Sequence, residues 1–254
     1  MKPLVSVGMP IYNCEKTIKA SVKSILNQTY DNWELIAIDD GSQDQTLSIL
    51  KSFTDSRIKI FSDGVNKSLP NRLNEAISLS KGKYFARMDG DDIAYPERFQ
   101  AQVKYLEKHS EVDLLSTNIV VIDHNNHATG GFPSTESHEE ICRRPWAGFP
   151  MTHPTWMGRL EWFRTHQYRP QAMRTEDTDL LLRTYDISRF AQLPEVMLGY
   201  RVDSLSLKKI LPGRYYTSLS LLEKAFVGKK YLYALGVIEQ AAKAAVDIFA
   251  ITTG

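Results

Sequence analysis

Short apolar runs alternate with amphipathic stretches between residues 4 and 109. Apolar runs of this length, bounded by turn residues, are typical of strands that are buried on both faces. We therefore predict strands at residues 4–9, 33–38, 58–61 and 84–88. The segments between and after them carry apolar side chains three and four positions apart, which predicts helices at residues 15–28, 46–53, 71–80 and 96–109. Pro10 is expected to end the first strand, because proline has no N–H group to give to a neighbouring strand.

Strands that alternate with helices favour an α/β fold with a parallel, doubly wound sheet. Ligands of such sheets bind beyond the carboxyl ends of the strands, which meet at one edge. Polar or acidic residues follow three of the predicted strands, namely Tyr12, Asn13, Asp39, Asp40, Asp89, Gly90, Asp91 and Asp92. Loops are polar in any protein, but the coincidence at three strand ends favours one shared site.

The densest of these clusters is Asp89-Gly90-Asp91-Asp92, directly after the apolar run that starts at Tyr84. Three carboxylates this close repel one another unless a cation lies among them. Their hard oxygen atoms suit Mg²⁺ or Mn²⁺, which keep some waters and take further ligands from substrate phosphates. The cluster thus predicts a metal–diphosphate site. The alternative is an acidic turn that caps the helix beginning at Pro96.

The pattern changes after residue 122, the end of a fifth predicted strand at residues 114–122. Residues 124–150 are rich in loop-forming and aromatic residues, and we expect this half to build the second wall of a cleft. Clustered carboxylates precede an apolar helical run at residues 174–183, and residues 192–201 are predicted to form a strand. Pro212 and Gly213 are expected to mark a break before two helices that fill residues 215–250.

Composition narrows the class of protein. The chain has 254 residues, of which 43% are apolar and 24% charged, as expected for a globular protein with ample core. The net charge of +1 gives no field that favours nucleic acid. The two cysteines, Cys14 and Cys142, are far apart, which predicts neither a disulfide framework nor a zinc site and fits a cytoplasmic location. We expect neither a signal peptide nor a membrane-spanning helix.

Several motifs occur together in a recognisable order. They are Pro10-Ile-Tyr-Asn13, Ile38-Asp-Asp-Gly-Ser-Gln-Asp44, Asn66 with Leu73-Asn-Glu-Ala-Ile77, Lys81-Gly-Lys-Tyr84, Arg87-Met-Asp-Gly-Asp-Asp92, His153-Pro-Thr155, Glu176-Asp-Thr-Asp-Leu-Leu-Leu-Arg183 and Gly199-Tyr-Arg-Val202. Between residues 4 and 205 the chain resembles the family 2 glycosyltransferases, inverting enzymes of the GT-A fold. The resemblance implies a Rossmann-like, mostly parallel central sheet flanked by helices, with a C-terminal helical extension.

The resemblance also implies a division of the chain. Residues 1–123 would form the nucleotide-sugar-binding half, residues 124–210 the acceptor-binding half of the same GT-A domain, and residues 211–254 the C-terminal helices. The last segment lies outside the resemblance and places Lys224, Lys229 and Lys230 near aromatic residues. A basic and aromatic stretch suits an anionic membrane surface. Packing on the domain or on a second subunit of a homo-oligomer is the alternative.

The family pattern assigns the donor site by analogy. It implies a UDP-linked sugar and a bound Mn²⁺ or Mg²⁺. Asp39 would accept the uracil N3–H, and Pro10 and Tyr12 would frame the base. The neighbouring nucleotide contacts would come from Asn13, Asp40, Asp89 and Gly90. Asp89 and Asp91 would form the D-x-D pair that holds the metal.

The acceptor side follows from the same resemblance. Asp177 would be the general base, and Glu176 and His153 would line the acceptor site or support it. Asp203 stands where many relatives carry a histidine, so the role of this position in the metal site is open. The acceptor would be a saccharide, free or lipid-linked, in bacterial surface-polysaccharide synthesis, and the sugar moved would be a hexosyl or N-acetylhexosaminyl group.

Plainer interpretations stand beside these assignments. Glu176, Asp177 and Asp179 are also what the first turn of a helix favours, and Arg72 is expected to be an exposed helix residue rather than a phosphate ligand. Three rivals to an active transferase remain: another metal-dependent nucleotide or nucleotide-sugar enzyme, a receiver-like binding module, and a transferase-like protein that binds nucleotide without turnover.

Overall fold

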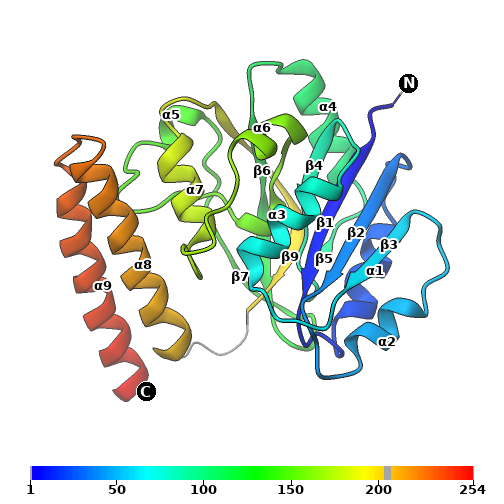
Figure 1. The fold of residues 1–254 in the computed structure, drawn as a ribbon. Helices are drawn as coiled ribbons and strands as arrows, with labels where there is room; N and C mark the ends of the chain where they lie inside the picture. Colours follow the sequence, from blue (N-terminus) through cyan, green and yellow to red (C-terminus); the bar gives the residue numbers. More distant parts are fainter. Residues whose placement is uncertain (1, 203–206, 254) are drawn as a thin grey trace.

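The computed structural model describes residues 2–202 and 207–253, and within them nine strands form one curled sheet (Figure 1). The order is β3-β2-β1-β4-β8-β6-β9-β5, and β7 pairs with β6 outside this path. The strands are β1 Val5–Ile11, β2 Trp33–Asp39, β3 Ile58–Ser62, β4 Tyr84–Arg87, β5 Ile93–Ala94, β6 Leu114–Ile122, β7 Ala128–Gly131, β8 Met157–Arg159 and β9 Phe190–Arg201.

The first four strands are parallel to one another, as the alternating pattern predicts. Helices cover both faces of the sheet, and each face has its own apolar core. On one face α1 (Ile18–Leu26) and α4 (Arg98–Lys108) pack side chains such as Val22 and Phe99 against the strands. On the other, α3 (Leu69–Leu79) and α6 (Leu160–Thr165) do so. The predicted α/β fold with a mostly parallel sheet flanked by helices is confirmed.

The second half of the chain enters the same sheet. The short strand β8 lies antiparallel between β4 and β6, and β9 runs parallel to β6 along its whole length. The sequence pattern did not reveal β5, β7 or β8, because segments of two to four residues are too short to show a period. Three further helices are α2 (Thr46–Lys51), α5 (His138–Ile141) and α7 (Glu176–Thr184), and a 3₁₀ turn forms at His153–Thr155.

The first strand does not end at Pro10, contrary to the prediction, but continues to Ile11. On the β4 side of β1, the carbonyl of Gly8 accepts the last hydrogen bond, from the N–H of Met88, because β4 ends at Arg87. Backbone groups alternate along a strand, so the nitrogen of Pro10 faces this same, vacated side. Its missing N–H therefore costs no ladder hydrogen bond.

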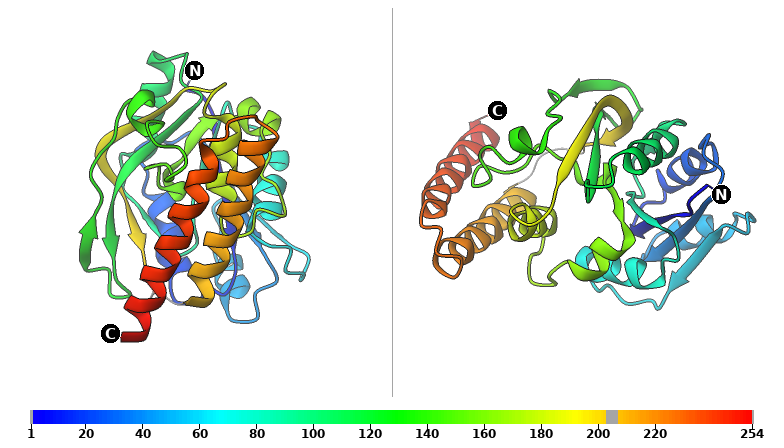
Figure 2. Two further views of the ribbon diagram at one scale, coloured as in Figure 1. Left: turned by 90° about the vertical axis from the view of Figure 1, so that its left-hand side faces the viewer. Right: turned by 90° about the horizontal axis from the view of Figure 1, so that it is seen from above.

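The predicted break at Pro212 is also wrong, since α8 (Leu207–Phe226) runs through it. Pro212 lies near the start of the helix, where its missing N–H forfeits a single backbone bond. Packing compensates, because Leu221 and Ala225 are fully buried and Arg214 binds Asp247 on α9 (Tyr233–Thr253). Figure 2 shows α8 and α9 side by side as a helical pair.

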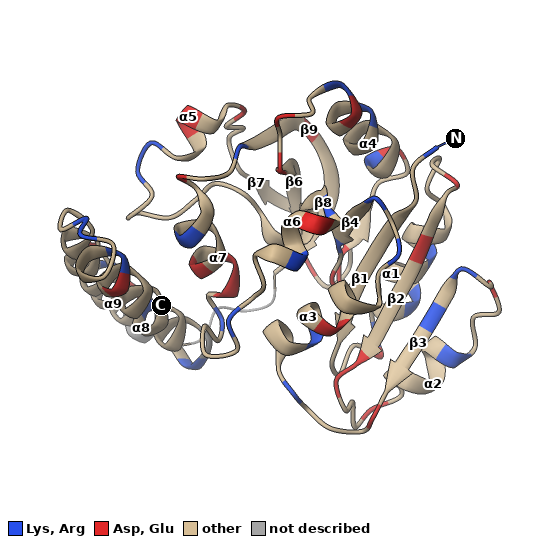
Figure 3. Ribbon diagram, turned by 45° about the horizontal axis from the view of Figure 1, so that its top comes forward, with Lys and Arg blue, Asp and Glu red and all other residues tan. Residues whose placement is uncertain are grey.

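Apolar side chains remain exposed along the outer side of α9, among them Leu235, Ile238, Val246 and Phe249. Within the described residues, no helix is long and apolar enough to cross a membrane. Membrane or subunit contact through these helices stays a prediction, as do the domain boundaries. Lys and Arg are interspersed with Asp and Glu over the ribbon (Figure 3).

Candidate active site

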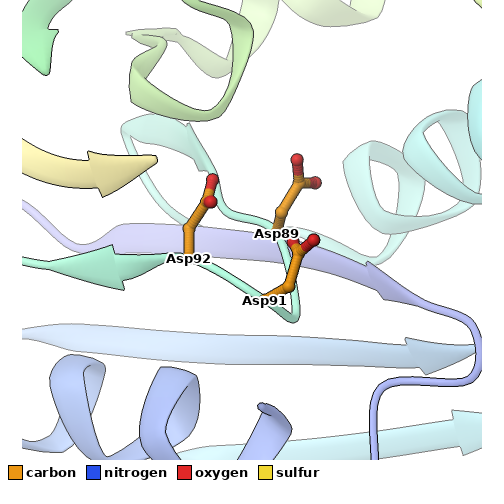
Figure 4. A group of neighbouring side chains, drawn as sticks. All are labelled: Asp89, Asp91 and Asp92. Atoms are coloured by element: carbon orange, nitrogen blue, oxygen red, sulfur yellow. The ribbon is translucent and has the colours of Figure 1, made fainter. Parts of the chain in front are cut away.

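The acidic turn after β4 brings three carboxylates together (Figure 4). One oxygen atom each from Asp89, Asp91 and Asp92 lies within 4.8 Å of the other two. Asp92 is fully buried; its Oδ1 accepts the backbone N–H of Arg201 at 2.8 Å, and its Oδ2 has no hydrogen-bond partner. Burial, followed by the charges of Asp89 and Asp91, raises the pKa of Asp92 well above its usual range. Three hard oxygen donors and a buried, unpartnered oxygen fit a divalent cation.

Arg201, the last residue of β9, holds this acidic turn in place. Its Nε donates to the carbonyl of Asp91 at 2.8 Å, and its Nη2 donates to Oδ1 of Asn126 at 2.6 Å. A third donor, Nη1, reaches the carbonyl of Asp123 after β6. The motif Gly199-Tyr-Arg-Val202 contains Arg201 but does not indicate this role, because only the sheet brings Arg201 to a turn 110 residues away.

A second arginine lies at the inner end of the turn. Arg87 is 3% exposed, and its Nη2 contacts Oδ1 of Asp89 at 2.8 Å. The other two guanidinium nitrogens, Nε and Nη1, are buried without a hydrogen-bond partner. Arg87 and Asp89 face the same side, because alternate residues of an extended chain share a face. Arg87 therefore places a positive charge directly behind the predicted metal ligand.

The predicted acceptor-side residues meet Asp89 in one cavity of about 710 Å³, called the main cavity here. Its lining includes Arg87, Asp89, His153, Glu176 and Asp177. Glu176 and Asp177 form the first turn of α7, where the helix dipole favours carboxylates. His153 comes from the 3₁₀ turn that follows Thr152. The fold thus assembles in space residues that the sequence only places in order.

Burial shapes the protonation of these groups. Loss of solvent, followed by the charge of Asp177, raises the pKa of Glu176 to about 7, and burial also raises the pKa of Asp177. Burial lowers the pKa of His153 well below its usual range, so this imidazole is neutral at pH 7. Its Nε2 lies 2.9 Å from the Tyr168 hydroxyl, and its Nδ1 lies 3.9 Å from Oε1 of Glu176. A carboxylate with a raised pKa is a better proton acceptor than a solvated one.

A smaller cavity of about 290 Å³ lies beside the main cavity, and Leu69 lines both. Its other lining residues are Pro10, Ile11, Tyr12, Asp40, Asn66 and Ser68. Asn66 and Ser68 lie in the loop before α3, and Leu69 is the first residue of that helix. No pattern in the sequence indicates a ligand contact for these three residues. The two cavities together run from the end of β1 past Asp89 to the start of α7.

The chain matches a known family. Residues 6–167 match the model described as glycosyl transferase family 2. The chain belongs to this family. The predicted resemblance is therefore confirmed, and the protein is a glycosyltransferase.

Two relatives illustrate the family. The putative glycosyltransferase EpsE of Bacillus subtilis is 39% identical over 214 residues, which cover 82% of this chain and 76% of EpsE. WfgD of Escherichia coli, a UDP-Glc:alpha-D-GlcNAc-diphosphoundecaprenol beta-1,3-glucosyltransferase, is 37% identical over 123 residues, 48% of each protein.

Solved structures share the fold at low identity. Staphylococcus aureus TarS, residues 1–349, in complex with UDP-GlcNAc superposes with a TM-score of 0.69 at 17% identity, covering 94% of this chain and 71% of TarS. The mannosyltransferase PcManGT from Pyrobaculum calidifontis, in complex with GDP-Man and Mn²⁺, gives a TM-score of 0.70 at 15% identity, covering 100% of this chain and 76% of its own. The GT-A-like architecture is thereby confirmed.

In this glycosyltransferase the residues predicted to hold the base lie at the ends of β1 and β2 and in the loops that follow, which hydrogen bonds connect. Asp39 is buried and accepts from the Ser62 hydroxyl at 2.9 Å and from the Ser42 N–H at 3.3 Å. Asn13 adopts a left-handed φ of 52°, and its Oδ1 accepts the N–H of Gln43 at 2.9 Å. Tyr12, which precedes Asn13, is 48% exposed, so its ring is available to a ligand.

The expectation for Arg72 is wrong, because this side chain is 1% exposed. Its Nε donates to Oδ1 of Asp40 at 2.7 Å, and its other nitrogens bind Asp63 and Glu75. The Asp40 carboxylate also accepts the backbone N–H groups of Lys67, at 2.7 Å, and Ser68, at 3.1 Å. Asp40 and Arg72 therefore fix the loop that lines the smaller cavity, and a direct nucleotide contact by Asp40 stays a prediction.

Gly90 and Asp203 are the two remaining predicted positions. Gly90 is the tight point of the acidic turn, where an added Cβ would lie 3.2 Å from Cγ2 of Ile11 and 3.3 Å from Sγ of Cys14. A side chain at this position would push β1 and the turn apart. Asp203 lies outside the described residues, so its predicted role is neither supported nor contradicted.

Proposed function

We propose that this glycosyltransferase moves a hexosyl or N-acetylhexosaminyl group from a UDP-sugar to a saccharide acceptor, with inversion, during bacterial surface-polysaccharide synthesis. One observation carries the proposal: Asp177 and Asp89 line the same cavity, and that cavity adjoins the smaller one between Tyr12 and Asp40. This neighbourhood supports a nucleotide in the smaller cavity, a metal at Asp89 and Asp91, and a base at Asp177, in the order that a nucleotide-sugar would need.

The relatives support the choice of substrates. The name of WfgD states a UDP-glucose donor and a diphosphoundecaprenol-linked acceptor, and TarS was solved with UDP-GlcNAc. PcManGT holds GDP-Man instead, so a guanine nucleotide is the natural comparison in any binding test. We assign uridine from the family resemblance, in which Asp39 accepts the uracil N3–H; Asp39 lies at the end of β2, next to Asp40, which lines the smaller cavity.

The metal site fits the same chemistry. Asp89, Asp91 and Asp92 would hold Mn²⁺ or Mg²⁺, and this cation would neutralise the charge that develops on the leaving diphosphate. Arg201 keeps the turn in the geometry that such a site requires, through its bonds to the Asp91 carbonyl and to Asp92. Arg87 compensates part of the negative charge from behind, through Asp89.

The proton transfer belongs to Asp177. An acceptor hydroxyl is a weak nucleophile until a carboxylate accepts its proton. Asp177 is partly exposed to the main cavity, and its raised pKa suits this task. Asp177 would accept the proton while the hydroxyl oxygen attacks the sugar carbon from the face opposite the diphosphate. One displacement inverts the configuration, so an α-linked UDP-sugar gives a β-linked product.

Calorimetry tests the donor half of this proposal. We expect UDP to bind the wild type only when Mn²⁺ is present, and to bind more tightly than GDP. The Asp91→Ala variant should not bind UDP. Absence of UDP binding under every metal condition would reject the uridine assignment.

Asp177→Asn tests the base. Turnover should fall about 10²- to 10⁴-fold, the usual contribution of a general base, while the affinity for the UDP-sugar stays within about twofold. Glu161→Gln, an exposed carboxylate on α6, is the matched control and should keep full activity. Equal turnover by Asp177→Asn and wild type would remove Asp177 from the reaction. A wild type that binds UDP-sugar but transfers to no acceptor would favour the nucleotide-binding alternative.

A further inference from the structure

A third cavity, of about 300 Å³, lies between α7 and the C-terminal helical pair; we call it the α7–α8 cavity. Arg174 and Asp177 line both this cavity and the main cavity. The proposed base is thus approached from two sides, one facing Asp89 and the other facing α8. Figure 1 shows α8 beside α7, and its residues Gly213 and Arg214 form the far wall. This wall lies outside the residues that match the family model.

The lining of the α7–α8 cavity favours an anion. Arg174 is exposed and makes no ion pair in the described part of the chain. Arg214 shares its charge with Asp247, at 3.0 Å from Nη2, and its Nη1 donates to Gln240 at 3.1 Å. Apart from Asp177, no carboxylate among the described residues lines this cavity.

An unused hydrogen-bonding group lies in the wall of the same cavity. Thr175 lines the cavity, is 5% exposed, and its Oγ1 is buried without a hydrogen-bond partner. A buried hydroxyl without a partner is costly unless a ligand or water satisfies it. Arg174 itself has a φ of 63°, a left-handed conformation that costs a non-glycine residue about 1–2 kcal/mol. A residue kept in such a conformation is often held there for function.

We propose that the α7–α8 cavity binds the diphosphate of the acceptor, with Arg174 as its principal contact. This proposal rests on the proposed function and takes the saccharide acceptor to be linked to a diphosphate, as the name of WfgD states for that relative. Guanidinium groups match the oxygen geometry of phosphate and form charge-assisted hydrogen bonds to it. With the diphosphate on the α8 side of Asp177, the sugar ring that follows it lies across Asp177. The ring then offers its hydroxyl to the base and to the donor in the main cavity.

Binding of inorganic pyrophosphate, measured by calorimetry in EDTA, tests the proposal without any turnover. Removal of divalent ions keeps pyrophosphate from the three aspartates of the donor site. We expect the wild type to bind pyrophosphate and Arg174→Gly to weaken this binding about tenfold. Glycine accepts a φ of 63° without strain, so this variant should unfold at a temperature no lower than the wild type. A loss of binding therefore cannot be attributed to a damaged fold.

Arg143→Ala is the matched control. Arg143 is also exposed, but it lines a separate cavity of about 270 Å³ beside α5. The variant removes the same charge and should bind pyrophosphate as the wild type does. The proposal is overturned if the wild type does not bind pyrophosphate, if Arg174→Gly binds it unchanged, or if Arg143→Ala loses as much affinity. Binding of glucuronate in place of pyrophosphate would assign the cavity to a sugar carboxylate and reject the diphosphate.

Kinetics separate this proposal from the proposed function. The two probes are an alkyl glycoside of α-GlcNAc and the same sugar linked to an alkyl diphosphate. Arg174→Gly should raise the KM for the diphosphate acceptor about tenfold more than the KM for the glycoside. Equal effects on both acceptors would contradict a diphosphate contact. If the wild type binds pyrophosphate but uses neither acceptor, the acceptor assignment fails and the anion site stands.

Discussion

Glu176 shows how burial, rather than residue type, sets the chemistry of a side chain in this site. Its Oε2 is buried without a hydrogen-bond partner, and its neighbours Asp177 and His153 offer it no positive charge at pH 7. A carboxyl in this position prefers to keep its proton. The cost of ionising it should therefore be visible in the stability of the whole chain.

Replacement of Glu176 by glutamine measures that cost. The folded-state pKa of about 7 exceeds the reference value of 4.5, so the folded chain holds the proton between these pH values and the unfolded chain does not. Wild-type stability should thus fall as the pH rises from 4.5 to 7, by up to about 3 kcal/mol. Glu176→Gln lacks the titrating carboxyl, so its stability should fall less over the same pH range. Urea unfolding at pH 5 and pH 8, without divalent ions, gives the comparison. Parallel pH curves for the two proteins would show that Glu176 titrates normally.

At the scale of elements, the site depends on pieces that are far apart in sequence. β9 delivers Arg201 to the acidic turn after β4, and α3 delivers Arg72 to the loop at residues 66–68. Arg201 donates to the backbone carbonyls of Asp91 and Asp123, whereas Arg72 donates to carboxylates, among them Asp40, which in turn accepts the N–H groups of that loop. Buried carbonyl and carboxylate oxygens need donors, and a guanidinium supplies several at once, so an arginine suits each position.

Arg201→Gln should weaken Mn²⁺ binding about 10- to 100-fold, the usual effect of losing a group that orients metal ligands. Titration calorimetry with Mn²⁺ measures this affinity. Arg189→Gln at the opposite end of β9 removes a guanidinium that pairs with the exposed Glu139, and it should bind Mn²⁺ normally. Wild-type affinity in Arg201→Gln would mean that the turn holds its shape without β9.

Replacement of two glycines by alanine should change the stability of the protein in opposite directions. An added Cβ at Gly213 in α8 would meet its nearest neighbour, the Arg174 carbonyl, at 3.8 Å, so Gly213→Ala should stabilise the helix by about 0.5–1 kcal/mol. At Gly8 in β1 the same atom would lie 2.4 Å from the Phe85 ring, so Gly8→Ala should destabilise the protein by about 1–3 kcal/mol. Thermal unfolding distinguishes them. Similar midpoints for both variants would contradict this packing.

At the scale of the whole molecule, one curled sheet joins the parallel strands β1 to β4 with β6, β8 and β9. The acidic turn after β4 is held by this junction, because its bonds run to Arg201 and to Arg87. A cation bound there should therefore stabilise the entire chain against unfolding and not only the turn.

Mn²⁺ at 100 times its dissociation constant should add about 2.7 kcal/mol, which raises the unfolding midpoint of a chain of this size by about 5–10 °C. The double variant Asp89→Asn/Asp91→Asn should show no such rise, and Asp31→Asn, an exposed carboxylate paired with Lys2, should show all of it. An equal rise in the double variant would place the stabilising metal elsewhere.

The sequence by itself determined the local structure and the chemical inventory. Strand 33–38 became β2 and residues 114–122 became β6, because each is a short, largely apolar segment bounded by turn residues. The turn at residues 89–92 and the acidic first turn of α7 were also recognisable, since their residue types and order carry the information. These features reappear in the structure where the pattern placed them.

Only the tertiary structure decided which distant parts meet. Three features depend on pairings between residues far apart in sequence: the insertion of β8 between β4 and β6, the burial of Arg72, and the hydrogen bond from Arg201 to the acidic turn. The free energy of such pairings comes from packing and hydrogen bonds that no local period records. The same holds for Pro10 and Pro212: whether a missing N–H is costly depends on what lies opposite it, and only the folded chain supplies that neighbour.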